Sequence, residues 1–396
     1  MPATYTYPGV YVEEVPSGVH PIAGVSTSDT AFVDFFRRGP IGVPVRVSSF
    51  TEFEREFGGL DAAAEASYQV QQFFVNGGAV AWVVREAVGA KLATNPLKKA
   101  SKQVFVVNAV NAGAWGSGVQ VSSDKGTTPT GGFNLYVREV QTIRGVATVV
   151  ATEVHRNLSV TATDARYAMS VVNADSRLVR LALPASGDAA AAGALPDDPS
   201  SGDPVADLGK PVSAAYTALA PGSDPDGTAP GQTELMAGVD ALDQIAPAVF
   251  NLLVLPADLP GADDAARAAA FKATIGAAQG KAEAKRAFLI YDVPASRRAP
   301  ADARTWFGGS DRPDASKNSA AYWPTLQIAD PLNEGRPKVI GARGAVAGIY
   351  ARTDAARGVW KAPLRKRSCM NAPTESRICD HSGSSLGSKT THLSPW

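Results

Sequence analysis

The chain has 396 residues, 45% of them hydrophobic and 19% charged, which suggests two or three folded domains and excludes an intrinsically disordered or fibrous protein. Its 38 basic and 38 acidic residues cancel, so the sequence has no net charge that would attract nucleic acid or an anionic membrane. No apolar run approaches the roughly 20 residues that cross a bilayer, and we expect a protein partner, with no nucleic acid and no membrane.

Residues 1–20 are predicted to form an extended arm. Strand-forming side chains are interspersed with proline and glycine, and a short strand without a hairpin partner nearby must pair with a distant strand or with another chain. A frayed, solvated terminus is the alternative, but it would not need so many aromatic and β-branched side chains. The residues expected to contact another subunit are Tyr5, Tyr7, Pro8, Gly9, Val10, Tyr11, Val12, Glu13 and Glu14.

Residues 21–90 are predicted to be the first part of an α/β core. Ser49 can cap a helix that Gly58 ends. A continuous apolar run around Trp82 is typical of a strand buried on both faces. The order strand, helix, strand indicates an α/β unit. Strands are expected at 24–36, 45–47 and 79–85, and helices at 50–57 and 62–76.

Residues 91–215 have the short strands and turn-rich connections of an all-β domain inserted into the α/β core. Within this domain, residues 185–210 are rich in alanine, glycine, aspartate and proline, and we expect a flexible linker there. The strands are predicted at 102–107, 118–122, 133–138, 146–155, 158–160 and 177–183.

The α/β pattern returns in residues 216–363, which are predicted to be the second part of the core. A buried strand, a long Ala-rich helix beginning at Asp263 and a second buried strand imply a parallel pair joined by a right-handed crossover. The expected fold class is α+β or α/β with several domains: an α/β core, an inserted β-rich domain and an extended N-terminal strand. Helices are expected at 233–245, 263–285 and 344–353, and strands at 249–255, 286–293, 320–328 and 338–340.

A series of short motifs follows a fixed order along the chain. The most specific is the sequence VAGIYARTD at 346–354, which leads to GVWKAP at 358–363. The others lie at 7–14, 24–28, 76–85, 113–116, 251–256, 291–294, 321–324 and 330–332. Each motif is modest alone, but their order and spacing over residues 5–363 resemble those of contractile tail-sheath proteins, which occur in phages and in related bacterial injection systems.

The resemblance implies an α/β sheath core and a structural protein rather than an enzyme. Sheath subunits form hexameric rings that stack into a metastable tube around an inner tube, and contraction drives the inner tube through a target envelope. Neighbouring subunits are joined by exchanged β-strands, and no cofactor is needed. The residues that the resemblance marks as structural are Trp82, Trp115, Gly348, Tyr350, Arg352, Asp354 and Trp360.

The resemblance also implies partners and a location. The partners would be further copies of the chain, the inner tail tube protein, and baseplate and terminator proteins. Assembly would take place in the bacterial cytoplasm, and the assembled protein would belong to a phage tail or a contractile injection particle. A sheath-like baseplate or terminator component is the nearest alternative, and a hydrolase built on the same α/β core is a more distant one.

The motifs that could carry chemistry are weak. The pattern G-x-S-x-G occurs at 383–387, but no predicted strand precedes it, as the serine hydrolase turn requires. Zinc could be bound by residue type, but the spacing of the candidate ligands matches no compact zinc site. We therefore assign no catalytic, cofactor-binding or metal-binding residue. The candidate ligands considered were Cys369, Cys379, His381 and His392.

Residues 364–396 do not continue the pattern, and we expect an atypical, disordered tail. In sheath proteins the turn at 358–363 leads into further strands and helices, which are not recognisable here. We hypothesise a disrupted reading frame near codon 364; a divergent tail is the alternative. Since that missing region would supply much of the sheet that receives the arm of a neighbour, we expect this chain to polymerise poorly.

Overall fold

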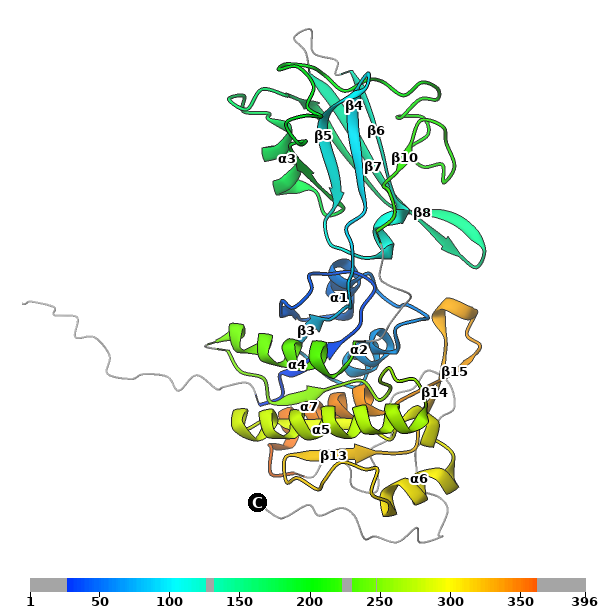
Figure 1. Ribbon diagram of the computed structural model, residues 1–396. Coiled ribbons are helices and arrows are strands. Elements are labelled where there is room, and N and C mark those ends of the chain that lie inside the picture. The colour runs from blue at the N-terminus through cyan, green and yellow to red at the C-terminus, as the bar shows by residue number, and fades with distance from the viewer. Residues whose placement is uncertain (1–26, 126–131, 223–229, 247, 362–396) are drawn as a thin grey trace, which may run out of the picture.

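The computed structural model describes residues 27–125, 132–222, 230–246 and 248–361. The predicted arm at 5–14 and the predicted tail at 364–396 lie outside the described residues. The protein is a mixed α/β structure with two lobes, an α/β lobe and a β-rich lobe (Figure 1). All strands from β4 to β10 belong to the β-rich lobe, and strands on both sides of this segment build the α/β lobe.

One six-stranded sheet, ordered β13-β12-β11-β1-β3-β2 among the described residues, forms the centre of the α/β lobe. Its neighbouring strands are parallel, except that β2 runs antiparallel to β3 at one edge. The expected parallel pair β11 and β12 is confirmed. The strands are β1 (Thr30–Asp34), β2 (Val45–Val47), β3 (Ala81–Arg85), β11 (Leu252–Val254), β12 (Phe288–Asp292) and β13 (Ser319–Tyr322).

Helices cover both faces of this sheet. Successive side chains of β1 pack into the cores on opposite faces. Phe32 belongs to the core beneath α1, α2 and α7, whereas Val33 belongs to the core beneath α4, α5 and α6. This division follows from the two-residue period of a strand. The helices are α1 (Phe50–Phe57), α2 (Glu65–Val75), α4 (Gln232–Ala241), α5 (Asp264–Lys285), α6 (Pro300–Gly308) and α7 (Arg343–Arg357), and a hairpin of β14 (Leu326–Ala329) and β15 (Pro337–Ile340) joins the first face.

Two antiparallel sheets form the β-rich lobe, ordered β10-β6-β7-β8 and β4-β5-β9. They share a core that includes Phe105, Trp115 and Phe133. The elements are β4 (Thr94–Lys99), β5 (Lys102–Ala109), the short helix η1 (Ala114–Gly118), β6 (Val119–Lys125), β7 (Phe133–Ile143), β8 (Val146–Leu158), α3 (Ala168–Asp175), β9 (Val179–Ala182) and β10 (Thr217–Ala218).

Helix ends follow their capping residues. The Ser49 side chain accepts a hydrogen bond from the backbone N–H of Glu52, and Gly58 ends α1 in the left-handed conformation with φ 88°, which glycine adopts without a steric penalty. Asp263 caps α5 in the same way by accepting from the N–H of Ala266. The bounds predicted for α1 are confirmed, and those predicted for α5 are confirmed to within one residue.

Some predicted strands were wrong. Residues 158–160 are not a separate strand, because β8 continues from Val146 to Leu158 in one ladder with β7. The expected strand at 320–328 divides into β13 and β14 at Trp323 and Pro324. The elements β4, α3, α6 and β10 were not predicted.

Residues 185–210 contain turns rather than helices or strands, and their flexibility stays a prediction. They are hydrogen bonded to the neighbouring strands. Asp197 accepts from Lys99 Nζ at 2.7 Å and from the N–H of Ala100 at 2.6 Å. The N–H of Gln103 donates to the carbonyl of Asp188 at 2.8 Å.

Candidate functional site

The structure gathers several of the predicted structural residues on one helix. Gly348, Tyr350, Arg352 and Asp354 all lie on α7. The predicted arm residues, Tyr5 to Glu14, lie outside the described residues, so their contacts stay a prediction. We therefore take α7 and the groups that it contacts as the candidate site.

Close backbone packing joins α7 to α2. A Cβ atom on Gly348 would lie 2.5 Å from the carbonyl oxygen of Phe73, and one on Gly344 would lie 2.2 Å from that of Gln69. Both distances are below any normal contact of a Cβ atom. Small residues four apart let two helices approach along one face. Gly344 was missed in the sequence, although it repeats Gly348 one turn earlier on the same face.

The far end of α7 is tied to the edge of the core sheet. The Tyr350 ring stacks on that of Phe288 in β12 with centroids 5.6 Å apart, and the Tyr350 and Tyr322 hydroxyls are 2.8 Å apart. Asp354 accepts a hydrogen bond from Ser28 Oγ at 3.3 Å. These contacts connect α7 with β12, β13 and the residues that lead into β1.

The predicted tryptophans do not form one site. Trp82 lies on β3 and packs partly buried against the core under α4 and α5. Trp115 is buried in η1 of the β-rich lobe, with the guanidinium of Arg38 5.7 Å from its ring centroid. Trp360 follows α7 and is 77% exposed. The sequence marked these residues individually, and the structure places them in separate surroundings.

A buried charge cluster begins α7 at the carboxyl edge of the core sheet. The guanidinium of Arg343, which is 2% exposed, lies 3.0 Å from Glu65 on α2, 3.1 Å from Asp292 at the end of β12 and 3.7 Å from Asp34 at the end of β1. Arg298 also contacts Glu65 at 3.2 Å. Sequence reasoning missed this cluster because its members are far apart in the chain.

The cluster occupies a position with a known use in α/β sheets. The chain runs from β1 to β3 on one side of the sheet and returns to β11 and β12 on the other. Ligands of open α/β sheets bind beyond the carboxyl ends of the strands at such a switch point. Here Arg343 spans the ends of β1 and β12 and joins their carboxylates to α2, so the groups at this position hold the lobe together.

Burial and neighbouring charges shift the pKa values of the carboxyl groups at this edge of the sheet in opposite directions. Burial raises the pKa of Asp34 to about 7, against the opposing attraction of Arg343. Burial would also raise the pKa of Glu65, but Arg343 and Arg298 outweigh it and lower the pKa to about 2. Glu86, directly after β3, has its pKa raised to about 7 by burial and by Glu234. Its Oε1 atom is buried without a hydrogen-bond partner among the described residues.

We expect the free energy of unfolding to fall as the pH rises from about 5 to about 7. The folded chain keeps the protons of Asp34 and Glu86 up to a pKa of about 7, whereas unfolded carboxyls release theirs near pH 4. The folded state therefore binds more protons in this window, which costs up to about 1.4 kcal/mol of stability per pH unit and group. Urea unfolding at several pH values measures the slope.

The matching control replaces both carboxyl groups by amides. Asp34→Asn together with Glu86→Gln should make the fall in stability between pH 5 and 7 less steep, because amides do not titrate. Glu65 does not change the slope between pH 5 and 7. Its pKa is lowered in the folded chain, so the stability that its ionised form contributes is lost only below about pH 4.5. An unchanged slope in the double variant would contradict the assignment.

The hydrolase alternative can be compared with one serine, histidine and glutamate group in the β-rich lobe. Ser176 Oγ donates to Glu153 Oε2 at 2.5 Å, and His155 Nε2 lies 3.5 Å from the same oxygen. The glutamate thus stands between the other two, whereas nucleophilic catalysis needs the histidine between serine and acid. Ser176 Oγ also accepts hydrogen bonds from the backbone N–H groups of Leu178 and Val179. These contacts shape a turn before β9.

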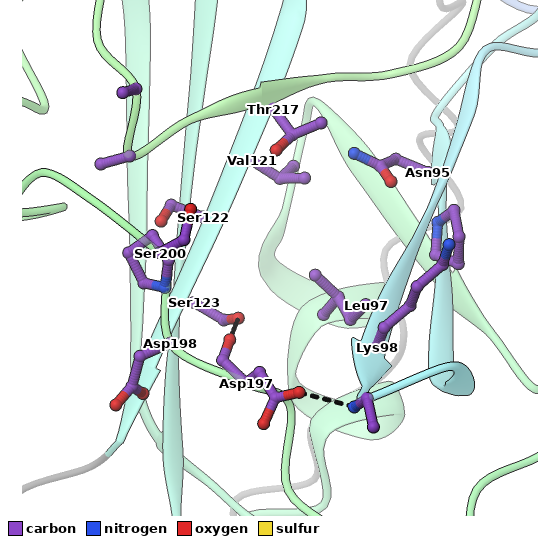
Figure 2. Close-up of a pocket in the computed structure, with 15 residues that line it drawn as sticks. Asn95, Leu97, Lys98, Val121, Ser122, Ser123, Asp197, Asp198, Ser200 and Thr217 are labelled. Carbon is purple, nitrogen blue, oxygen red and sulfur yellow. Dashed lines mark hydrogen bonds between the residues drawn. The ribbon is translucent and has the colours of Figure 1, made fainter.

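A pocket of about 420 Å³ lies in the β-rich lobe between β4, β6 and the loop at 197–200 (Figure 2). Two carboxylates line it, and both already have partners. Asp197 accepts hydrogen bonds from Lys99 Nζ and from the N–H of Ala100. Asp198 accepts from the N–H of Lys125 at 2.9 Å. The polar groups around this pocket therefore hold the loop against the strands.

No family model matches the chain, and no curated protein sequence matches it significantly. Among solved structures, it is similar to a sheath tail protein from Listeria innocua, with 12% identity and a TM-score of 0.50, over 88% of this chain and 60% of that one. A sheath tail protein from Desulfitobacterium hafniense matches with 14% identity and a TM-score of 0.48, over 87% and 62%. The contracted helical sheath of the anti-feeding prophage matches with 16% identity and a TM-score of 0.35, over 94% and 59%.

The similarity to the Listeria protein establishes the fold. The chain has the fold of a sheath tail protein over most of its length, as the sequence motifs predicted. It spans about 60% of the length of that protein. In the part of the chain that the structure describes, no helix is both long enough and apolar enough to cross a membrane.

Proposed function

We propose that the chain is a structural subunit of a contractile tail sheath. The observation that carries the proposal is the fold similarity to the sheath tail protein of Listeria innocua over 88% of this chain. Fold alone does not imply function, but the motif order in the sequence supports the same family independently. The role is structural rather than catalytic, and the subunits act by rearranging against one another.

The proposed assembly consists of copies of the chain in stacked hexameric rings around an inner tube protein, with baseplate and terminator proteins at the ends. The arm at 5–14 would add a strand to a sheet on a neighbouring subunit, since backbone hydrogen bonds to a sheet edge tolerate a variable sequence. Residues 91–215 would be carried as an inserted domain on a core formed by 21–90 and 216–363. Contraction would be a rigid-body rearrangement of subunits.

The internal arrangement of the α/β lobe suits this role. Arg343 and its acidic partners, together with the close contact of α2 and α7, tie both parts of the core into one unit. A subunit that must move as a body in a lattice has to keep its own packing while its interfaces change. Close-packed interiors have that property, since they switch between discrete arrangements rather than deform continuously.

The test is negative-stain electron microscopy with sedimentation analysis of the purified 396-residue chain. We expect weak assembly, with short tubes at high concentration only, because residues 364–396 do not continue the sheath pattern of the sequence. A variant lacking residues 1–20 should lose them. A chain that stays monomeric at every soluble concentration would contradict the proposal, and single rings that never stack would favour a baseplate or terminator component.

A further inference from the structure

A cluster of arginine and acid side chains lies where the two lobes meet. From the α/β lobe, Arg37 and Arg38 follow β1. From the β-rich lobe, Glu139 and Gln141 lie on β7. We call these four residues the arginine junction.

Each member of the arginine junction has a partner across the boundary. Arg38 Nη1 lies 3.2 Å from Glu139 Oε2, and Arg37 Nη2 lies 3.5 Å from Glu139 Oε1. Arg37 Nη1 donates to Gln141 Oε1 at 2.8 Å, and Gln141 Nε2 donates to Glu139 Oε1 at 2.6 Å. Both carboxylate oxygens and the amide of Gln141 are therefore engaged together.

The arginines are held firmly on their own side. Phe36, directly before them, is fully buried and packs edge-on against Phe53 of α1 at a centroid distance of 5.5 Å. The buried Arg85 donates from Nε to the carbonyl of Phe36 at 2.8 Å. It also donates from Nη1 to the carbonyl of Ala112 in the β-rich lobe at 2.7 Å. The segment that presents Arg37 and Arg38 is thus fixed before it meets the second lobe.

Solvent is largely excluded from the acid. The side chain of Glu139 is 2% exposed, whereas those of Arg37 and Arg38 are 25% and 15% exposed. A buried carboxylate keeps its charge only with hydrogen bonds and a cation. Separating the lobes would break all of these contacts together. We therefore expect the ion pairs of Glu139 to stabilise the docked arrangement more than an exposed ion pair does.

Another ion pair between the lobes is exposed to solvent. Arg144, in the turn between β7 and β8, lies 3.6 Å from Glu334 in the turn between β14 and β15. Their side chains are 51% and 64% exposed. Exposed pairs of this sort contribute little, which makes this contact a matched control for the arginine junction.

We infer that the arginine junction fixes the β-rich lobe in one orientation on the α/β lobe, so that the two lobes turn as one body. Lobes joined by a small polar interface move relative to each other by default, and the chain passes from the α/β lobe into the β-rich lobe after β3 and returns after β10. The inference goes beyond the proposed sheath function, because it concerns the isolated chain and does not require assembly.

The experiment measures the distance between the lobes in the full chain. Spin labels are placed at two exposed positions, Thr163→Cys on the β-rich lobe and Ala273→Cys on α5, in a background with Cys369→Ser and Cys379→Ser. Double electron–electron resonance then gives the distance distribution. We expect one narrow distribution for the parent chain and for the control Arg144→Gln, and a broad one for Glu139→Ala.

In Glu139→Ala, we expect the ratio of docked to undocked lobes to fall by about 30-fold or more. This is the usual effect of removing one partner of a buried charge pair. A second variant, Arg37→Gln with Arg38→Gln, changes the other lobe and should give the same broadening, so local misfolding of β7 cannot explain both results. Circular dichroism checks that each variant stays folded. A distribution as narrow as that of the parent in both folded variants would overturn the inference.

Discussion

Replacing Arg343 by methionine is expected to lower the free energy of unfolding by about 3–5 kcal/mol, the usual cost of removing one partner from a buried ion pair. Methionine keeps the unbranched stem of the side chain but leaves the buried Asp292 without its cation, which lies 3.1 Å away in the native chain. Urea denaturation at pH 7, with the slope compared between variants, measures the loss.

The control is Arg267→Met on α5. Arg267 pairs with Asp264 at 2.9 Å, but both side chains are 53% exposed, so a change within about 0.5 kcal/mol is expected. An Arg343→Met chain as stable as Arg267→Met would mean that the cluster does not hold the lobe. The deficit of Arg343→Met should also shrink as the pH falls, because an unpaired buried carboxylate takes up a proton.

Gly348→Ala is expected to destabilise the chain by about 1–3 kcal/mol, as overpacking of a closed core does. The added Cβ atom would lie 2.5 Å from the carbonyl oxygen of Phe73, and backbone cannot rotate away as a flexible side chain can. The same holds for Gly344→Ala against Gln69. Thermal and urea unfolding give the magnitude.

Gly276→Ala on α5 is the matched control, because it changes glycine to alanine in another helix where no atom lies within 4 Å of the new Cβ. Alanine there should stabilise the chain by about 0.5–1 kcal/mol through its higher helix propensity. The two substitutions are thus expected to have opposite signs. A stabilising Gly348→Ala would show that α2 and α7 can separate without cost.

The sequence predicted the elements whose signals are local. The bounds of α1 were found because Ser49 and Gly58 are strong capping residues. The edge strand β4 was missed because Pro96 interrupts its pattern and charged Lys98 and Lys99 end it, and only pairing with β5 makes it a strand. Tertiary contacts overrode local preference there.

The candidate site was predictable only in part. Gly348, Tyr350 and Asp354 came from the motif at 346–354, and the structure gives each a defined contact. Arg343 precedes that motif and has no charged neighbour in sequence that would mark it. Its partners come from β1, α2 and β12, so only the assembled topology brings them together.

The pairing of β1 with β11 has a consequence for how the chain is made. Thr30 pairs with Ala81 on one side and with Leu252 on the other, so one edge of β1 waits for a partner that the ribosome supplies 222 residues later. At about 5–20 residues per second, that delay is roughly ten to forty seconds. The β-rich segment emerges meanwhile, and its strands pair within itself. The edge of β1 that pairs with β11 would therefore stay open to chaperones until β11 is made, although β1 can already pair with β3.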